Sequence, residues 1–405
     1  MINYSQDSGD WFNNVLISAI EKRASDIHFE PERDTFNVRF RVDGLLHESE
    51  SLNKYSQDNI ISKIKVLSNM NITEHRLPQD GHFEFNYKNR IYNIRASTLS
   101  GLYGETLVLR ILNREEILIN LENLGFLSDQ LELVNKIIVG SSGLVIVTGP
   151  TGSGKTNLLY SIIRTLNKPD KNIITLEDPI EYQMPNIRQT QINESVGLSY
   201  SKAMRSVLRQ DPDIVMLGEI RDIDTAQMAV MASLAGIFIF TSFHTFDVAA
   251  LVTRFQELGI SNAIIAQAVR GVISTRLIRI ICSFCKEPQK PDYEKIGPSA
   301  RRIIDRFSAQ ATFQRGRGCD KCDGKGYLGR TGIFEVVYFD EEIQASIIER
   351  RSAFFIRELI KKKKNKSIRE CAIEKAIRGI TTFEEVVRVL GMEMEENFDK
   401  NTPTP

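Results

Sequence analysis

Eight consecutive residues carry the side-chain types and the spacing that hold a nucleoside triphosphate. Two glycines, with four residues between them, precede a lysine and a threonine. Glycines let the backbone curl so that its N–H groups point at a phosphate, and the N-terminus of the next helix favours an anion. The lysine can reach the β- and γ-phosphates, and the threonine hydroxyl can bind Mg²⁺. The predicted phosphate loop consists of Gly149, Pro150, Thr151, Gly152, Ser153, Gly154, Lys155 and Thr156.

The residues on either side of this loop have the pattern that such a loop requires. The apolar run from Leu144 to Val147, with Thr148, predicts a buried strand, and Asn157 to Leu166 predict a helix. A glycine-rich turn that only resembles a phosphate loop is the alternative. The strand–loop–helix order argues against it.

Acidic residues follow the next predicted strand, Ile173 to Leu176. Glu177, Asp178 and Glu181 would lie at the carboxyl end of a parallel strand, where α/β sheets bind their ligands. They could position water or hold the metal shell. Alternatively, they could be surface acids that cap the next turn, and the residues alone leave both interpretations open.

Two further predicted strands end in groups that can act on a phosphate. Ile214 to Leu217 and Gly218 lead to Glu219, and an acid in this place can orient attacking water or hold Mg²⁺ through a bound water. An exposed acid at a strand end is the alternative. Ile237 to Phe243 leads to His244, which could sense the γ-phosphate by hydrogen bonding or could be structural.

Four of the five cysteines form two C-x-x-C pairs, the ligand pattern of a structural tetrahedral zinc site. The 33 residues between the pairs exceed the usual spacing, so the segment between them is expected to be an insert. Redox chemistry is the alternative, but no thioredoxin-like βαβ pattern surrounds either pair. With no fifth ligand evident, we expect a closed, noncatalytic site formed by Cys282, Cys285, Cys319 and Cys322.

The residues before the phosphate loop predict a separate α+β domain. Asp43-Gly44 indicates a hairpin, and Pro78-Gln79-Asp80-Gly81 predicts a turn. Strand–helix alternation from the phosphate loop to about Thr275 predicts an α/β domain with a mostly parallel sheet. Helical patterns cover residues 11–22 and 57–69, and strand patterns cover 24–30, 36–42, 82–87, 90–98, 106–112 and 332–337.

The composition limits the classes of partner. Among 405 residues, 52 are lysine or arginine and 52 are aspartate or glutamate, so the formal net charge is zero. This balance argues against a global basic field for nucleic acid. The polar N-terminus lacks the apolar core of a signal peptide, and the longest apolar runs are too short to span a bilayer. A cytoplasmic protein without a transmembrane segment is expected, docked on a membrane only through a partner.

Five motifs, in order along the chain, resemble those of the secretion ATPase superfamily. Its members drive type II secretion, type IV pilus assembly and retraction, and some type IV secretion. By this resemblance Glu177, Asp178 and Glu181 match the Asp box of the family, Glu219 matches its catalytic glutamate, and His244 matches its His box. Residues 24–31, 39–44 and 76–81 are similar to its N-terminal PAS-like domain. The motifs are the phosphate loop, Thr175 to Tyr182, Leu208 to Asp213, Gly218 to Asp222 and Phe243 to Thr245.

The resemblance implies a ring-shaped homohexamer that hydrolyses ATP with Mg²⁺. It implies an N-terminal PAS-like domain at 1–112, a linker at 113–127 and a RecA-like P-loop ATPase domain at 128–405, of overall α/β class, with ATP between the two domains. The second domain would carry the zinc insert at 282–325 and C-terminal helices. Arginines of the first domain would reach the phosphates, and the best matches are Arg76, Arg95 and Arg110. For each of them, an arginine on the polar face of a sheet is the alternative.

The cysteine insert and residues 329–335 resemble the branch that assembles type IV pili and powers type II secretion. This branch implies a motor at the inner membrane, held there by a platform protein, that adds pilin-like subunits to a fibre. Pilus retraction and type IV secretion or conjugation are the alternatives within the family. A nucleic-acid motor is the alternative outside it, which the lack of aromatic–basic interleaving disfavours. The family usually has a histidine where Ile237 stands and often an arginine where His82 stands, so altered turnover is expected.

Overall fold

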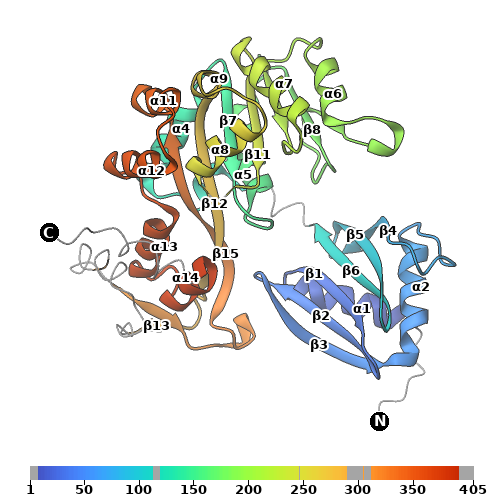
Figure 1. Ribbon diagram of the computed structural model, residues 1–405. Coiled ribbons are helices and arrows are strands. Elements are labelled where there is room, and N and C mark those ends of the chain that lie inside the picture. The colour runs from blue at the N-terminus through green and yellow to red at the C-terminus, as the bar shows by residue number, and fades with distance from the viewer. Residues whose placement is uncertain (1–7, 113–118, 246, 290–303, 305–311, 392–405) are drawn as a thin grey trace. The chain divides into compact units, whose positions relative to one another are not determined.

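The computed structural model describes residues 8–112, 119–245, 247–289, 304 and 312–391 (Figure 1). The chain divides into two compact units, residues 1–117 and 118–405. Each unit has its own hydrophobic core. None of the helices in the described ranges is long and apolar enough to cross a lipid bilayer.

The first unit is a six-stranded antiparallel sheet with the order β3-β2-β1-β6-β5-β4. Every second residue of β2 is buried, and these side chains pack with Phe12 and Leu16 of helix α1. This alternation is what a sheet with one covered face requires. The elements are α1 (Ser8–Glu21), β1 (Ala24–Pro31), β2 (Thr35–Val42), β3 (Leu45–Asn53), α2 (Gln57–Leu67), β4 (Gln79–Tyr87), β5 (Arg90–Gly101) and β6 (Gly104–Leu112).

The turn predicted at residues 78–81 is wrong, because strand β4 begins at Gln79. Gly81 pairs with Ala96 of β5 inside the sheet. A Cβ atom at position 81 would lie 2.2 Å from the carbonyl oxygen of Ser68. The glycine therefore permits a close approach of two backbone segments. Such an approach, and not a turn, explains the glycine at this position of the strand.

The second unit is built on a seven-stranded sheet with the order β15-β12-β7-β11-β10-β8-β9. Neighbouring strands are parallel except for β12 and β15, which are antiparallel. Strands β8, β10 and β11 are buried along their whole length, which is typical of strands covered on both faces. Because the carboxyl ends of parallel strands meet at one edge, the residues after β7, β8, β10 and β11 are gathered there.

The elements of this unit run in chain order from residue 128 to residue 390 (Figure 1). They are α4 (Ser128–Ile138), β7 (Gly143–Thr148), α5 (Lys155–Leu166), β8 (Ile173–Glu177), β9 (Arg188–Gln191), α6 (Tyr200–Val207), β10 (Ile214–Leu217), α7 (Ile223–Leu234), β11 (Phe238–Phe243), α8 (Val248–Glu257), α9 (Asn262–Ala268), β12 (Val269–Ile281), β13 (Lys286–Pro288), β14 (Gln314–Gly316), β15 (Tyr327–Tyr338), α11 (Glu341–Ile348), α12 (Ala353–Lys362), α13 (Ile368–Ile377) and α14 (Phe383–Leu390).

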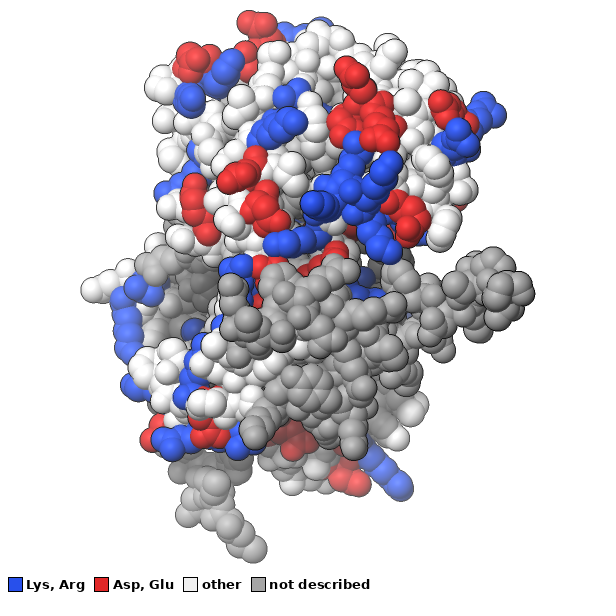
Figure 2. Space-filling model, turned by 90° about the vertical axis from the view of Figure 1, so that its left-hand side faces the viewer, with Lys and Arg blue, Asp and Glu red and all other residues white. Residues whose placement is uncertain are grey.

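Charged side chains of both signs lie next to one another on the face of the molecule in Figure 2. Lys363, which follows α12, illustrates the pairing, because its ammonium group lies 2.8 Å from a carboxylate oxygen of Asp340 and 2.7 Å from one of Glu342. The lysine-rich end of α12 is thus partly neutralised by acids at the start of α11. This local balance matches the zero net charge of the whole sequence.

Candidate functional site

The phosphate loop connects strand β7 to helix α5, which begins at Lys155. Gly149, Gly152 and Gly154 have φ angles of 151°, 73° and 90°, a region that side-chain-bearing residues rarely adopt. At Gly149 a Cβ atom would also lie 2.5 Å from the carbonyl oxygen of Thr275. The glycines therefore give the loop its curled backbone and let it pack against β12.

The side chain of Lys155 folds back onto the loop. Its Nζ atom donates to the carbonyl oxygens of Gly149, at 2.8 Å, and Pro150, at 3.0 Å. Burial lowers the pKa of this ammonium group, while the charge of Glu219 acts in the opposite direction. Lys155 and Glu219 therefore share one electrostatic environment at the carboxyl edge of the sheet.

Glu219, which follows β10, is bound by two cationic or potentially cationic side chains. One carboxylate oxygen pairs with the guanidinium of Arg221, and the other lies 3.1 Å from Nε2 of His244. Arg221 also reaches the next strand, because its Nη1 atom lies 3.3 Å from Oδ2 of Asp178. The structure thus brings Asp178 and Glu219 together around Arg221, and it places His244 at the second oxygen of Glu219.

The three acids at the end of β8 and just after it have different surroundings. Glu177 is only 3% exposed, and its carboxylate accepts hydrogen bonds from three neighbouring side chains. The next residues, 178–184, form what we call the acidic loop. In this loop Asp178 is 36% exposed at its side chain and faces Arg221, and the backbone N–H of Glu181 donates to the hydroxyl of Tyr160 at 3.2 Å.

The three candidate arginines lie in the first unit. Arg95 of β5 and Arg110 of β6 are directly opposite each other in the antiparallel register. Arg110 donates through Nε to Oδ1 of Asp26 at 2.9 Å. Arg76 lies in the segment before β4 and is not part of the sheet. The structure therefore brings Arg95 and Arg110 together on neighbouring strands.

The segment that carries Arg76 is held by a buried ion pair that sequence reasoning missed. The Nζ atom of Lys65 lies 2.6 Å from Glu105 and donates to the carbonyl oxygen of Glu74 at 2.7 Å. Hydrogen bonds from Arg76 and neighbouring backbone groups lower the pKa of Glu74 to about 2. Lys65 and Glu105 are 40 residues apart, so no local pattern could have revealed the pair.

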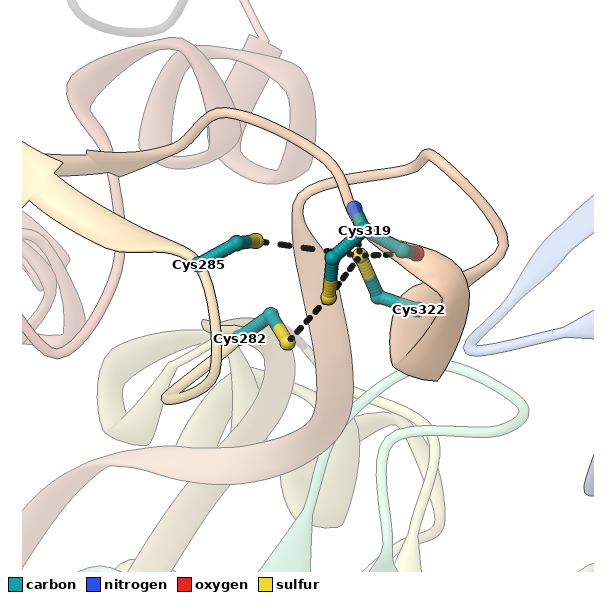
Figure 3. A group of neighbouring side chains, drawn as sticks. All are labelled: Cys282, Cys285, Cys319 and Cys322. Atoms are coloured by element: carbon teal, nitrogen blue, oxygen red, sulfur yellow. Dashed lines mark hydrogen bonds between the residues drawn. The ribbon is translucent and has the colours of Figure 1, made fainter.

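The four cysteines of the two C-x-x-C pairs form one cluster (Figure 3). Three sulfur–sulfur distances are 3.9 Å for Cys282 and Cys319, 3.8 Å for Cys285 and Cys322, and 3.7 Å for Cys319 and Cys322. A tetrahedral ion with metal–sulfur bonds of about 2.3 Å sets its sulfur ligands about 3.8 Å apart. The cluster therefore fits a tetrahedral metal ion, as predicted from the spacing of the cysteines.

Backbone groups favour a thiolate at Cys322, whereas burial raises the pKa of the Cys282 and Cys285 thiols. Burial alone would raise the pKa of Cys322, but backbone N–H groups of Cys319 and Gly326 point at its sulfur and bring the pKa below its ordinary value. The fifth cysteine, Cys371, lies elsewhere and contacts Oε1 of Gln130 at 3.6 Å. Thiolate character at Cys322 is the chemistry that a metal ligand needs.

The sequence matches known proteins over most of its length. The family model "Type II/IV secretion system protein" matches residues 9–388. The type IV pilus assembly ATPase PilB of Thermus thermophilus is 41% identical over 376 residues, which cover 92% of this chain and 42% of PilB. The type II secretion system protein E of Pseudomonas aeruginosa is 40% identical over 377 residues, 93% of this chain and 74% of that protein. The chain thus spans less than half the length of the first relative and about three quarters of the second.

Solved structures share the fold. The Legionella pneumophila ATPase DotB is 21% identical and superimposes with a TM-score of 0.69, covering 95% of this chain and 96% of DotB. The pilus retraction motor PilT with bound ADP is also 21% identical, with a TM-score of 0.60 over 95% of this chain and 97% of PilT. At this level of identity the likeness concerns the fold alone.

Proposed function

Since the chain belongs to the family of type II/IV secretion system proteins, we propose that it is an ATP-hydrolysing motor for pilus assembly or type II secretion. The observation that carries the proposal is the meeting of four groups at the carboxyl edge of one sheet. There Lys155 begins the helix after a curled phosphate loop, while Glu219 lies between Arg221 and His244. This arrangement can bind a triphosphate and activate a water molecule beside it.

Each residue of the site has a proposed role. Lys155 and the loop N–H groups bind the phosphates, and Glu219 polarises the attacking water. His244 holds the second oxygen of Glu219, from which it lies 3.1 Å away, and so fixes the direction of the carboxylate. The Thr156 hydroxyl and Asp178 are oxygen ligands of the kind that Mg²⁺ prefers. When bound, Mg²⁺ would neutralise charge that develops on the phosphates.

The larger assembly is also part of the proposal. The first unit would be the PAS-like domain of the family, and Arg76, Arg95 and Arg110 would supply positive charge to the transition state. A guanidinium offers a fixed fork of donors to phosphate oxygens, which gives this assignment its physical sense. The RecA-like second units would form a homohexamer at the inner membrane, where a platform protein would receive the motion of the ring.

We propose that the cysteine cluster binds Zn²⁺ in a structural role, because its four sulfur atoms have the spacing of a tetrahedral thiolate site. Replacing Cys322 by serine is expected to lower the zinc content from one ion per chain to less than about a tenth of an ion per chain. It is also expected to lower the thermal unfolding temperature. Metal analysis of the purified protein measures the first effect, and thermal unfolding measures the second.

Cys371→Ala is the matched control for the zinc site. It also removes a buried thiol of the second unit, but one that lies outside the cluster. We expect this variant to retain its full zinc content. Equal zinc in the Cys322→Ser variant and the unmodified protein would contradict the assignment.

The proposed function is tested in two steps. The purified chain should release phosphate from ATP, and DNA or RNA should leave that rate unchanged, because stimulation by nucleic acid would indicate a nucleic-acid motor. In the host, an inactive Lys155→Ala chain should abolish surface fibres if the motor assembles pili. Normal fibres with trapped exported proteins would indicate type II secretion. Excess fibres would indicate retraction and would overturn the assembly proposal.

A further inference from the structure

A buried network joins the phosphate-loop helix to the acidic loop. Helix α5 begins at Lys155, and five residues later it presents Tyr160, which is 1% exposed. The tyrosine hydroxyl donates to Oε2 of Glu177, the last residue of β8. The hydroxyl oxygen of Tyr160 in turn accepts the backbone N–H groups of Glu181, at 3.2 Å, and Tyr182, at 3.4 Å. One hydroxyl group thus connects a helix, a strand end and a loop.

The carboxylate of Glu177 completes the network from the other side. Its Oε1 atom accepts from Thr175 Oγ1 at 2.5 Å and from Gln189 Nε2 at 3.1 Å. The Gln189 amide also binds the acidic loop, because it donates to the carbonyl oxygen of Tyr182 at 2.8 Å and accepts the N–H of Met184 at 2.7 Å. Side chains from α5 and β9 therefore hold the loop directly, and Glu177 of β8 joins these two side chains to each other.

These contacts give Glu177 surroundings that differ from those of the exposed acids. Its two oxygens are both occupied by protein donors in a site with 3% exposure, so the carboxylate is directed into the core. Asp178, one residue later, faces Arg221, and Arg221 pairs with Glu219. A path therefore runs from the phosphate-loop helix to Glu177, along the chain to Asp178, and through Arg221 to the proposed catalytic carboxylate.

We propose that Tyr160 is a positioning residue for ATP hydrolysis, acting through Glu177 and the acidic loop on Asp178 and Arg221. The inference rests on the proposed function. Phosphate binds at the N-terminus of α5. The hydrogen bonds of the buried Tyr160 hydroxyl couple the position of the acidic loop to the position of that helix. Asp178 then keeps Arg221 in its place beside Glu219. By the same argument Glu177 is a positioning residue, and it does not touch the reacting atoms.

The first test is the Tyr160→Phe variant of the full chain. It removes only the hydroxyl, and it leaves a buried carboxylate with one donor fewer and two loop N–H groups without their acceptor. We expect kcat for ATP to fall about 10-fold while KM stays within about threefold, because the phosphate-binding groups are unchanged. A kcat within twofold of the unmodified protein would overturn the proposal, as would a rise in KM with kcat unchanged.

Tyr327→Phe is the matched control. Tyr327 is a half-buried tyrosine of the same unit whose hydroxyl bonds to Thr382 Oγ1 at 2.7 Å, away from the acidic loop. This variant loses a comparable hydrogen bond and is expected to keep its kcat. A similar loss in both variants would show a general cost of removing a tyrosine hydroxyl and would overturn the specific role of Tyr160.

A double-mutant cycle tests whether Tyr160 and Glu177 act as one unit. Glu177→Gln is expected to lower kcat about 10-fold, and the double variant is expected to lose little more than either single variant. Independent, multiplying losses would overturn the proposal. So would a loss in Glu177→Gln as large as in Glu219→Gln, because Glu177 would then act on the reacting atoms.

Hydrogen exchange provides a readout that does not depend on turnover. In the unmodified protein the amides of Glu181 and Tyr182 should be protected, and in Tyr160→Phe they should exchange at least about tenfold faster. Unchanged exchange would overturn the positioning role whatever the ATPase rates are. An unmodified chain that shows this protection and yet never hydrolyses ATP would instead overturn the proposed function.

Discussion

The Glu219→Gln variant is expected to bind ATP normally and to hydrolyse it about 10²–10³-fold more slowly. Glutamine has nearly the shape of glutamate, but its neutral amide cannot polarise water or accept a proton as a carboxylate does. The ion pair with Arg221 involves a side chain that is 51% exposed, so its loss should cost little stability. Steady-state phosphate release gives kcat, and titration with a fluorescent ATP analogue gives the affinity.

Glu257→Gln is the control for this substitution. Glu257 also pairs with an arginine in the second unit, Arg254 at 2.8 Å, but on helix α8. Its variant should keep both kcat and KM. Near-normal turnover by Glu219→Gln would exclude Glu219 from the catalytic role.

The Lys155→Ala variant is expected to lose about 10³-fold in kcat/KM for ATP. The ammonium group is the positive charge at the start of α5, and charge-assisted contacts to phosphate act in both the bound state and the transition state. Its removal also leaves the carbonyl oxygens of Gly149 and Pro150 without the donor that they have now. Phosphate release over a range of ATP concentrations measures the loss.

Lys202→Ala is the matched control for Lys155→Ala. The Lys202 ammonium also donates to a backbone carbonyl, that of Gly197 at 2.8 Å, in the same unit. We expect this variant to turn over ATP at the normal rate. A Lys155→Ala chain that keeps a tenth or more of the original kcat/KM would contradict the assignment of the phosphate loop.

Much of the site was accessible from the sequence because its elements are local. A glycine-rich loop between a strand and a helix, and acids directly after apolar strands, place their residues at one edge of a parallel sheet. The direction of each side chain was less accessible. Thr175 and Glu177 are two residues apart and so point to the same face of a buried strand. That alternation was the available signal that Glu177 is directed away from Asp178.

The errors in the fold have physical reasons. Strand β9 was not predicted because Arg188 to Gln191 are four polar residues at a sheet edge and show no apolar alternation. The residues around Gly81 predict a turn, whereas in the structure its lack of a side chain allows the close approach of Ser68. The pairing of Lys65 with Glu105 depends on tertiary structure and has no local signature. In each case the deciding contact is made with a residue distant in sequence.

Carbonyl oxygens of the phosphate loop compete with a bound phosphate for the Lys155 ammonium group. Nζ of Lys155 holds two carbonyl oxygens of the loop, so an incoming anion must draw it away from them. The binding free energy is then the difference between the contacts that Lys155 makes to the ligand and the contacts to the two carbonyl oxygens that it gives up. A ligand with a single phosphate compensates for less of these lost hydrogen bonds than a ligand with three. Selectivity for polyphosphates over single anions is therefore expected from the contacts of the loop itself.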